Sequence, residues 1–228
     1  FDQAVANTGR LIDAAGAAGV PRIVHISVTN ASPSSPLAYF RGKGLTEESV
    51  VRSGLSHAII RPSLVFGRED ILVNNIAWIL RRMPIFGVPG SGDYRVQPVS
   101  VEDVADLAVS SGSRTDSIVM DAVGPEVFSF KELIRMISAA VGSRARLVSI
   151  RPTVALLAVA LIGRLVDDIV LTSDELEGLM ANLLVSGGPP TGTRRFSEWL
   201  TEYAGRVGLT YAHELKRHYR SATRSTGP

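Results

Sequence analysis

The chain contains no cysteine, which excludes disulfide bonds and thiol catalysis. A protein without cysteine is typical of the cytoplasm, and we predict a cytoplasmic location. The net charge is only +2, so the composition gives no support for a nucleic-acid-binding surface. Lysine is also scarce. Lys43, Lys131 and Lys216 are the three lysines among 24 basic residues, and the others are arginine.

Long apolar runs are absent as well. The longest, Val154–Ile162, lies between Arg151 and Arg164 and is far short of the roughly 20 residues that span a bilayer. We interpret it as a helix packed on its neighbours in a substrate domain, and a membrane-associated or partner-facing helix is the alternative. No signal peptide is visible. The four histidines show no metal-ligand spacing, so we predict no metal site.

The N-terminal part alternates helical and strand patterns. Residues 1–19 have helical spacing, 22–28 form a β-branched run, 37–52 read as a helix, and 58–60 form a second buried strand. Short loops between such segments predict βαβ units, a parallel sheet and an α/β fold. Further along the chain we predict helices at 71–82, 102–110, 129–141, 153–166, 173–184 and 194–206, and strands at 97–101, 117–122 and 146–150.

The most informative motif is Tyr39-Phe40-Arg41-Gly42-Lys43. On a helix, the four-residue spacing places the phenol and the ammonium on one face. A neighbouring cation stabilises a phenolate, so we expect Lys43 to lower the pKa of Tyr39 and Tyr39 to act as a general acid or base. With five tyrosines and three lysines, such a match arises by chance in roughly 7% of chains of this length. A surface pair on an amphipathic helix is the alternative interpretation.

The order of several segments carries a resemblance to a known family. The chain resembles an atypical extended short-chain dehydrogenase/reductase, of the NAD-dependent epimerase/dehydratase or NmrA-like kind. Its sequence pattern is similar to that of the 39-kDa subunit of respiratory complex I. The segments that carry the resemblance, over roughly residues 1–185, are residues 7–15, 19–27, 39–43, 53–55, 60–67, 97–105, 123–126 and 129–134.

This resemblance implies site residues. Tyr39 would exchange the substrate proton, and Lys43 would bind the nicotinamide ribose of NAD or NADP and lower the tyrosine pKa. Ser27 would be the catalytic serine, with Thr29 as the other choice of register, although Ser27 could equally be a buried hydroxyl bonded to the backbone. Cofactor contacts are expected at Pro62, Ser63 and Val65.

The resemblance also has departures. Ala4 stands where such enzymes have an asparagine, and Asn7 where a glycine is usual. The glycine-rich loop that cradles the pyrophosphate is not present upstream of Tyr39. The segment from Gly87 to Gly92 does not replace it, because it follows a helix and contains Pro89, so we interpret it as a crossover loop. We therefore expect the chain to be a fragment or a truncated form with an exposed apolar sheet edge.

The expected domain organisation follows from the same resemblance. It consists of a remaining Rossmann-type segment at 1–70, a substrate-domain crossover at 71–96, a return to the sheet at 97–123, a mostly helical substrate domain at 124–205 and a polar tail at 206–228.

Two functions remain open from the sequence. One is an NAD(P)-dependent oxidoreductase or sugar-nucleotide-type epimerase/dehydratase, and the other is a non-catalytic NAD(P)H-binding sensor or assembly subunit. Tyr94 and Arg95 are weak candidates for contact with an unidentified small-molecule substrate, Arg95 through a phosphate or carboxylate. We expect a homo-oligomer or a larger complex, with no nucleic acid and no transmembrane span.

Overall fold

The computed structural model describes residues 2–168 and 171–213. Its central element is a parallel sheet in the order β1 (Arg22–Ile26), β2 (Ser56–Pro62) and β7 (Ile118–Ala122). The register pairs Ile26 with Ile60, and Pro62 with Ala122. The predicted α/β class with a parallel sheet is therefore confirmed. β1 forms one edge of this sheet, where Ile26 is 41% exposed.

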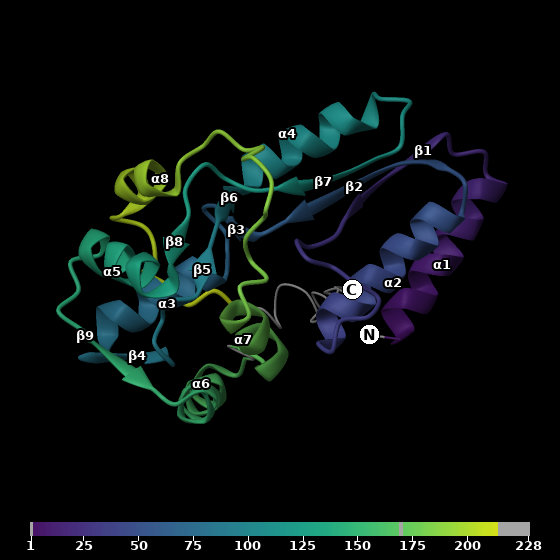
Figure 1. Cartoon of the computed structure of the whole chain (residues 1–228). Helices are drawn as coiled ribbons and strands as arrows, with labels where there is room; N and C mark the ends of the chain where they lie inside the picture. The colour runs from purple at the N-terminus through teal and green to yellow at the C-terminus, as the bar shows by residue number, and fades with distance from the viewer. Residues whose placement is uncertain (1, 169–170, 214–228) are drawn as a thin grey trace, which may run out of the picture.

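Helices cover both faces of the sheet (Figure 1). On one face, α1 (Asp2–Ala17) and α2 (Ala38–Arg52) contribute Ile12 and Val50, which pack on Ile59 of β2. On the other face, α4 (Val101–Gly112) places Val104 against Ile60. Consecutive strand residues point to opposite faces, so two adjacent isoleucines of β2 serve two different helical layers.

The position of α2 on the sheet is set by an ion pair and by a close backbone contact. Glu47 of α2 accepts two hydrogen bonds from Arg61 of β2, at 2.9 and 2.5 Å. A Cβ atom at Gly44 would lie 2.3 Å from the backbone of Ser32 and Pro33, so only glycine allows the loop after β1 to approach the helix.

The remaining elements form a second lobe around one large core (Figure 1). Inside it, Phe196 stacks on Trp199, and Phe66 packs edge-on against Phe196 and at a tilt against Trp199. The helices of this lobe are α3 (Leu72–Arg82), α5 (Phe130–Ala140), α6 (Pro152–Val166), α7 (Ser173–Met180) and α8 (Phe196–Tyr203). Its short strand pairs are β3 (Leu64–Phe66) with β6 (Pro98–Ser100), β4 (Ile85–Pro89) with β9 (Arg146–Ile150), and β5 (Arg95–Val96) with β8 (Phe128–Ser129).

The structure corrects one sequence-based interpretation and confirms another. The segment expected to be a crossover loop begins with strand β4, which pairs in parallel with β9, and only the turn at Gly90 and Gly92 remains irregular. The capping box expected at Ser129 and Glu132 is present at the start of α5. Among the described residues, no helix is both long and apolar enough to cross a membrane. The domain boundaries expected from the sequence stay a prediction.

Candidate functional site

Tyr39 and Lys43 lie one turn apart on α2, beside the carboxyl end of β1. The Lys43 ammonium donates a hydrogen bond to the carbonyl oxygen of Ile26 at 3.2 Å, and it lies 6.0 Å from the centroid of the Tyr39 ring. The spacing therefore places the two side chains on one helix face, as predicted. Ligands of open α/β sheets bind outside the carboxyl ends of the strands, and this is such an end.

Ser27 and Thr29 follow β1, and the structure distinguishes them. The Thr29 hydroxyl donates to the carbonyl oxygen of Leu183 at 2.8 Å, so it serves the packing of the loop after α7. Ser27 is 5% exposed, and its hydroxyl has no hydrogen-bond partner in the described part of the chain. A buried hydroxyl without a partner is costly, so it is available for a ligand.

His25 belongs to the same site, although the sequence did not single it out. It lies on β1 two residues before Ser27, on the sheet face that α2 covers. Its Nε2 atom is buried and has no hydrogen-bond partner within the described residues. Burial lowers the pKa of His25, and the nearby Lys43 lowers it further, against a smaller opposing effect of Glu47. The alternation of side chains along a buried strand could have revealed this residue.

The expectation that Lys43 lowers the pKa of Tyr39 is wrong for this structure. Burial raises the pKa of the Tyr39 phenol, and the carboxylate of Glu175 raises it further. Burial also lowers the pKa of Lys43, with Glu47 opposing this shift. Desolvation disfavours the charged form of each group, and it is the largest cause of both shifts. Tyr39 is therefore protonated at neutral pH.

Helix α7 of the second lobe docks on the start of α2. Leu37, the residue before α2, provides no side-chain cap. Instead the Asp174 carboxylate accepts a hydrogen bond from the backbone N–H of Ala38 at 3.1 Å. A Cβ atom at Gly178 would lie 2.5 Å from the Phe40 ring, so the two helices are in close contact. This contact brings Glu175 toward Tyr39 and places the phenol where the two lobes meet.

The three expected cofactor contacts lie at the end of β2 and just beyond it. Pro62 is buried, and its carbonyl oxygen accepts a hydrogen bond from the N–H of Thr29 at 2.9 Å. Ser63 is also buried, and its hydroxyl donates to the carbonyl oxygen of Gln97. Val65 packs in the core layer below α4. The hydroxyl of Ser63 is thus already used within the protein.

The two weak substrate candidates have different surroundings. Tyr94 is 8% exposed, stacks on Phe130 and donates its hydroxyl hydrogen to the carbonyl of Pro89 at 3.2 Å. Burial raises its pKa. These contacts give Tyr94 a packing role in the second lobe. Arg95 is exposed, and its backbone N–H donates to Asn182. Its role as a substrate contact stays a prediction.

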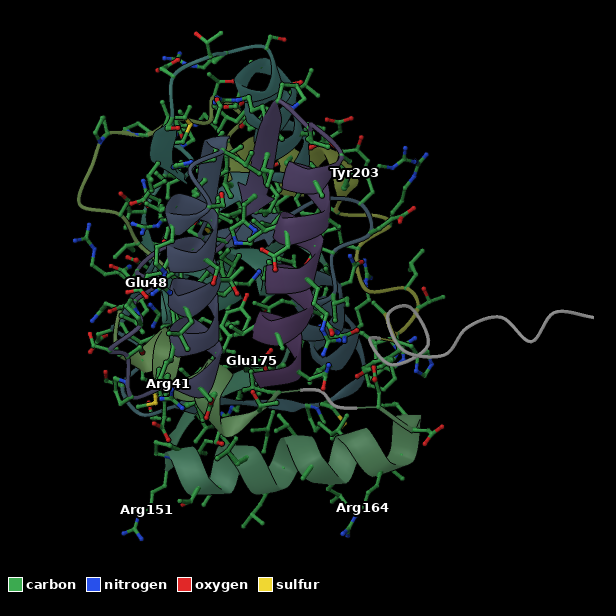
Figure 2. All side chains as sticks on the ribbon, turned by 90° about the vertical axis from the view of Figure 1, so that its right-hand side faces the viewer. Arg41, Glu48, Arg151, Arg164, Glu175 and Tyr203 are labelled. Atoms are coloured by element: carbon green, nitrogen blue, oxygen red, sulfur yellow. The ribbon has the colours of Figure 1, made fainter. Side chains whose placement is uncertain are left out.

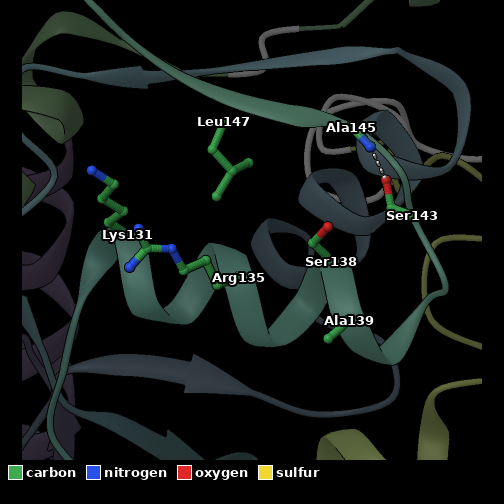
Figure 3. A pocket seen from close by; sticks show the side chains of 7 residues that line it. All are labelled: Lys131, Arg135, Ser138, Ala139, Ser143, Ala145 and Leu147. Atoms are coloured by element: carbon green, nitrogen blue, oxygen red, sulfur yellow. Dashed lines mark hydrogen bonds between the residues drawn. The ribbon is translucent and has the colours of Figure 1, made fainter.

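A groove elsewhere in the molecule was not predicted. It has a volume of about 510 Å³ and lies between α5 and β9, on the opposite side of the molecule from α2 (Figure 1). Figure 3 shows the side chains of Lys131 and Arg135 extending to the same end of this groove, below Leu147. Ser138, Ala139, Ser143 and Ala145 line its other end. The groove contains none of the predicted catalytic residues.

Two groups near the carboxyl end of β1 have hydrogen-bonding capacity left over for a ligand. An ammonium carries three donor hydrogens, and Ile26 accepts from Lys43 while Ser27 retains a free hydroxyl in the described chain. These are groups that would fit the ribose of a nicotinamide cofactor. In the described residues, no cluster of histidine, cysteine, aspartate or glutamate could hold a metal ion.

Comparison with known proteins identifies relatives of two kinds. The chain is 32% identical over 119 residues to the mitochondrial NADH dehydrogenase 1 alpha subcomplex subunit 9 of Arabidopsis thaliana, covering 50% of this chain and 29% of that protein. It is 27% identical over 210 residues to an NAD(P)H azoreductase of Xenophilus azovorans, covering 91% of this chain and 68% of the relative. The chain thus spans about a third of the length of the complex I relatives it matches. No family model matches it.

Solved structures share the fold. An NADPH-dependent quinone oxidoreductase from Escherichia coli has a TM-score of 0.64 at 20% identity, over 93% of this chain and 71% of that one. A nucleoside-diphosphate-sugar epimerase from Staphylococcus aureus has a TM-score of 0.64 at 15% identity, over 85% and 69%. The resemblance deduced from the sequence is confirmed to this extent: the chain is similar in sequence to the 39-kDa subunit of complex I and to an NAD(P)H azoreductase, and it shares its fold with an epimerase and a quinone oxidoreductase.

Proposed function

We propose that this chain is part of an NAD(P)-dependent oxidoreductase of the extended short-chain type, with its reacting centre at the carboxyl end of β1. The observation that carries the proposal is the convergence of Lys43 and Ser27. Lys43, one turn from Tyr39 on α2, has donor hydrogens to spare and contacts the carbonyl oxygen of Ile26. Ser27, the next residue after Ile26, has a buried hydroxyl without a partner in the described residues. A relative named as an NAD(P)H azoreductase supports this choice of chemistry.

Each residue has a distinct role in this proposal. Lys43 would hold the ribose hydroxyls of NAD or NADP, Ser27 would bind the substrate oxygen, and Pro62 and Val65 would contact the nicotinamide side of the site. The cofactor, when bound, supplies or accepts the hydride. Tyr39 would donate a proton to the substrate oxygen, because its raised pKa keeps it protonated at neutral pH. This protonation state favours reduction of a carbonyl or a similar acceptor over oxidation of an alcohol.

The test is the substitution Tyr39→Phe in the whole protein. A positioned general acid contributes about 10²–10⁴-fold to a rate. We therefore expect kcat to fall by about that factor, while the Kd for NADPH or NADH, measured by fluorescence titration, stays within about twofold. Tyr203→Phe, on α8 in the second lobe, is the matched control and should leave kcat unchanged. Unchanged turnover in Tyr39→Phe would rule out the acid role.

Lys43→Met tests the cofactor contact separately. We expect the Kd for NADPH or NADH to rise by at least about tenfold, because a charge-assisted hydrogen bond contributes about 1.5–3 kcal/mol. If neither the parent protein nor the variants bind either cofactor, the proposed site is wrong and not only the role of Tyr39.

A non-catalytic NAD(P)H-binding subunit is the second candidate. The relatives named as NADH dehydrogenase subunits favour it, and a binding module needs the lysine but no ionisable phenol. NADPH and NADH oxidation measured against a panel of carbonyl, quinone and azo acceptors separates the two functions. Cofactor binding without turnover on any acceptor would favour the subunit role.

The contact with the substrate, the larger assembly and the cellular location are also proposals. Arg95 would contact a phosphate or carboxylate of the substrate, and the whole protein would work as a homo-oligomer or in a larger complex. A cytoplasmic location stays our prediction, while the relatives of the NADH dehydrogenase kind are named as mitochondrial.

A further inference from the structure

Helix α6 presents an apolar face to solvent. The side chains of Leu157, Leu161 and Leu165 are 71%, 62% and 80% exposed, and Val154 is 46% exposed. These residues recur at steps of three or four, so they form one stripe along the helix, which also includes Ala158. We call these five residues the outer face of α6. Monomeric proteins rarely expose a contiguous stripe of leucines, and such a stripe marks an interaction surface.

The opposite side of α6 is apolar too and is occupied by the protein. Ala155 and Gly163 are buried, and Ile162 packs against the core of the second lobe. The helix is therefore held in place by one side, while the outer face contributes nothing to that packing. The expectation that the run Val154–Ile162 is simply a helix packed on its neighbours accounts for only half of its surface.

Arginines border the outer face at both ends. Arg151 precedes the helix and Arg164 lies in its last turn, and both are exposed. Figure 2 shows α6 along the edge of the molecule, with Arg151 and Arg164 both pointing away from the rest of the protein. No carboxylate occurs between residues 152 and 166, and the first one after the helix is Asp167. The outer face is thus apolar along its length, with an arginine at each rim and Asp167 just beyond the C-terminal one.

We propose that α6 binds the surface of an anionic lipid bilayer, lying flat with its outer face among the acyl chains. A 15-residue helix is about 22 Å long, too short to span a bilayer but suited to lie in its interface. Leucines enter the acyl boundary, while arginines extend their long side chains to the lipid phosphates. The charge at the rims is what selects this occupant, because anionic headgroups surround an apolar layer in the same arrangement.

A second copy of the chain fits the outer face less well. In a two-fold contact between two antiparallel α6 helices, each end would bring together two arginines, Arg151 of one copy and Arg164 of the other, with Asp167 as the carboxylate beside them. Like charges across a desolvated contact oppose association. A lipid surface satisfies both the leucines and the arginines, and this inference is independent of the function proposed for Tyr39.

Binding to vesicles tests the proposal on the whole protein. We expect co-sedimentation with vesicles of phosphatidylcholine mixed with phosphatidylglycerol, and much weaker binding to phosphatidylcholine alone. The double variant Leu157→Glu with Leu161→Glu should lose binding altogether. Leu161→Ala should weaken it by at least about tenfold, because three apolar carbons leave the acyl region. Leu11→Glu is the matched control, since Leu11 is 69% exposed on α1.

The arginines are tested in the same assay. Arg151→Gln and Arg164→Gln should each weaken binding to the anionic vesicles about fivefold, from roughly 1 kcal/mol per basic residue near such a surface. Arg10→Gln on α1 should not change it. All these side chains are exposed, so far-UV circular dichroism and thermal unfolding should match the parent protein.

Three results would overturn the proposal. One is the absence of vesicle binding by the parent protein. Another is equal binding by the parent and by the Leu157→Glu, Leu161→Glu variant. The third is a change of oligomeric state in that variant, measured by light scattering without vesicles, which would assign the outer face to a second copy of the chain instead.

Discussion

The ion pair between Glu47 and Arg61 connects the helix that carries Tyr39 and Lys43 to the central strand of the sheet. The Glu47 side chain is 7% exposed and that of Arg61 is 29% exposed. Two hydrogen bonds join them at 2.9 and 2.5 Å, and the pairing raises the pKa of Arg61. We predict that Glu47→Gln destabilises the protein, because it leaves a guanidinium facing a neutral amide in a largely dry position.

The magnitude follows from the exposure of the two partners. Breaking a fully buried pair by removing one partner costs about 3–5 kcal/mol. Water reaches the exposed part of Arg61 and solvates the remaining charge, so we expect a loss of about 2–3 kcal/mol in the free energy of unfolding. For a protein of this size, that corresponds to a Tm lower by roughly 4–12 °C.

The assay is a double-mutant cycle with chemical denaturation. The variants are Glu47→Gln, Arg61→Leu and the combination, and we expect a coupling energy of about 2 kcal/mol. The matched control is the neighbouring pair Glu48–Arg52 on the same helix, which joins at 3.0 Å but is 44% and 69% exposed. Its coupling should be only about 0.3–0.5 kcal/mol. Equal coupling in the two cycles would refute the argument from burial.

Four further predictions concern the surroundings of the site. Gly44→Ala should lower the free energy of unfolding by about 1–3 kcal/mol or more, because the new Cβ atom would collide with the backbone of Ser32 and Pro33. Gly9→Ala, in the open part of α1, should raise it by about 0.5–1 kcal/mol. Urea unfolding measures both values, and a reversed order would contradict the close contact at Gly44. Asp174→Ala should lower the free energy of unfolding by about 1 kcal/mol, because it removes the acceptor that caps α2, and its equality with the parent would show that the cap is unimportant. The pKa of His25 in the folded protein lies below 6.5, so the unfolded state binds more protons and stability falls as the pH drops below 6.5. His25→Gln should therefore flatten the decline of Tm on acidification. An unchanged pH profile of Tm would exclude His25 as the cause of that decline. Glu175→Gln should lower the pKa of Tyr39, and ultraviolet difference titration at 295 nm would detect this as ionisation of the phenol at a lower pH. An unchanged titration curve would mean that Glu175 does not act on Tyr39.

The elements around the parallel sheet could be predicted from local patterns. The β-branched runs of β1 and β2 and the capping box of α5 are signals contained within a few residues. Strand β4 was missed because its sequence contains Gly87 and Pro89, which are typical of loops. Its partner β9 lies about 60 residues further along the chain, and Pro89 is tolerated because it lies at the end of the strand. Pairing over that distance leaves no local signal.

The placement of several candidate site residues was predictable, but their electrostatics were not. The spacing of Tyr39 and Lys43 determines that they share a helix face, and the alternation along β1 determines that Ser27 faces the same layer as His25. Burial and the approach of α7 arise from the second lobe, more than 130 residues away in the sequence. No local pattern could have indicated that Glu175 would lie near the phenol.

The raised pKa of Tyr39 keeps the phenol in its protonated form over a wider pH range than that of an ordinary tyrosine. A lysine 6.0 Å from the ring favours the phenolate, but burial and a carboxylate oppose it and prevail. A tyrosine that stays protonated near neutral pH can give a proton and cannot take one. If the site is catalytic, reduction should be faster than the reverse oxidation at pH 7, and the oxidation should accelerate with pH as the phenol ionises. An oxidation rate that is already maximal at neutral pH would mean that bound cofactor reverses the balance between Lys43 and Glu175.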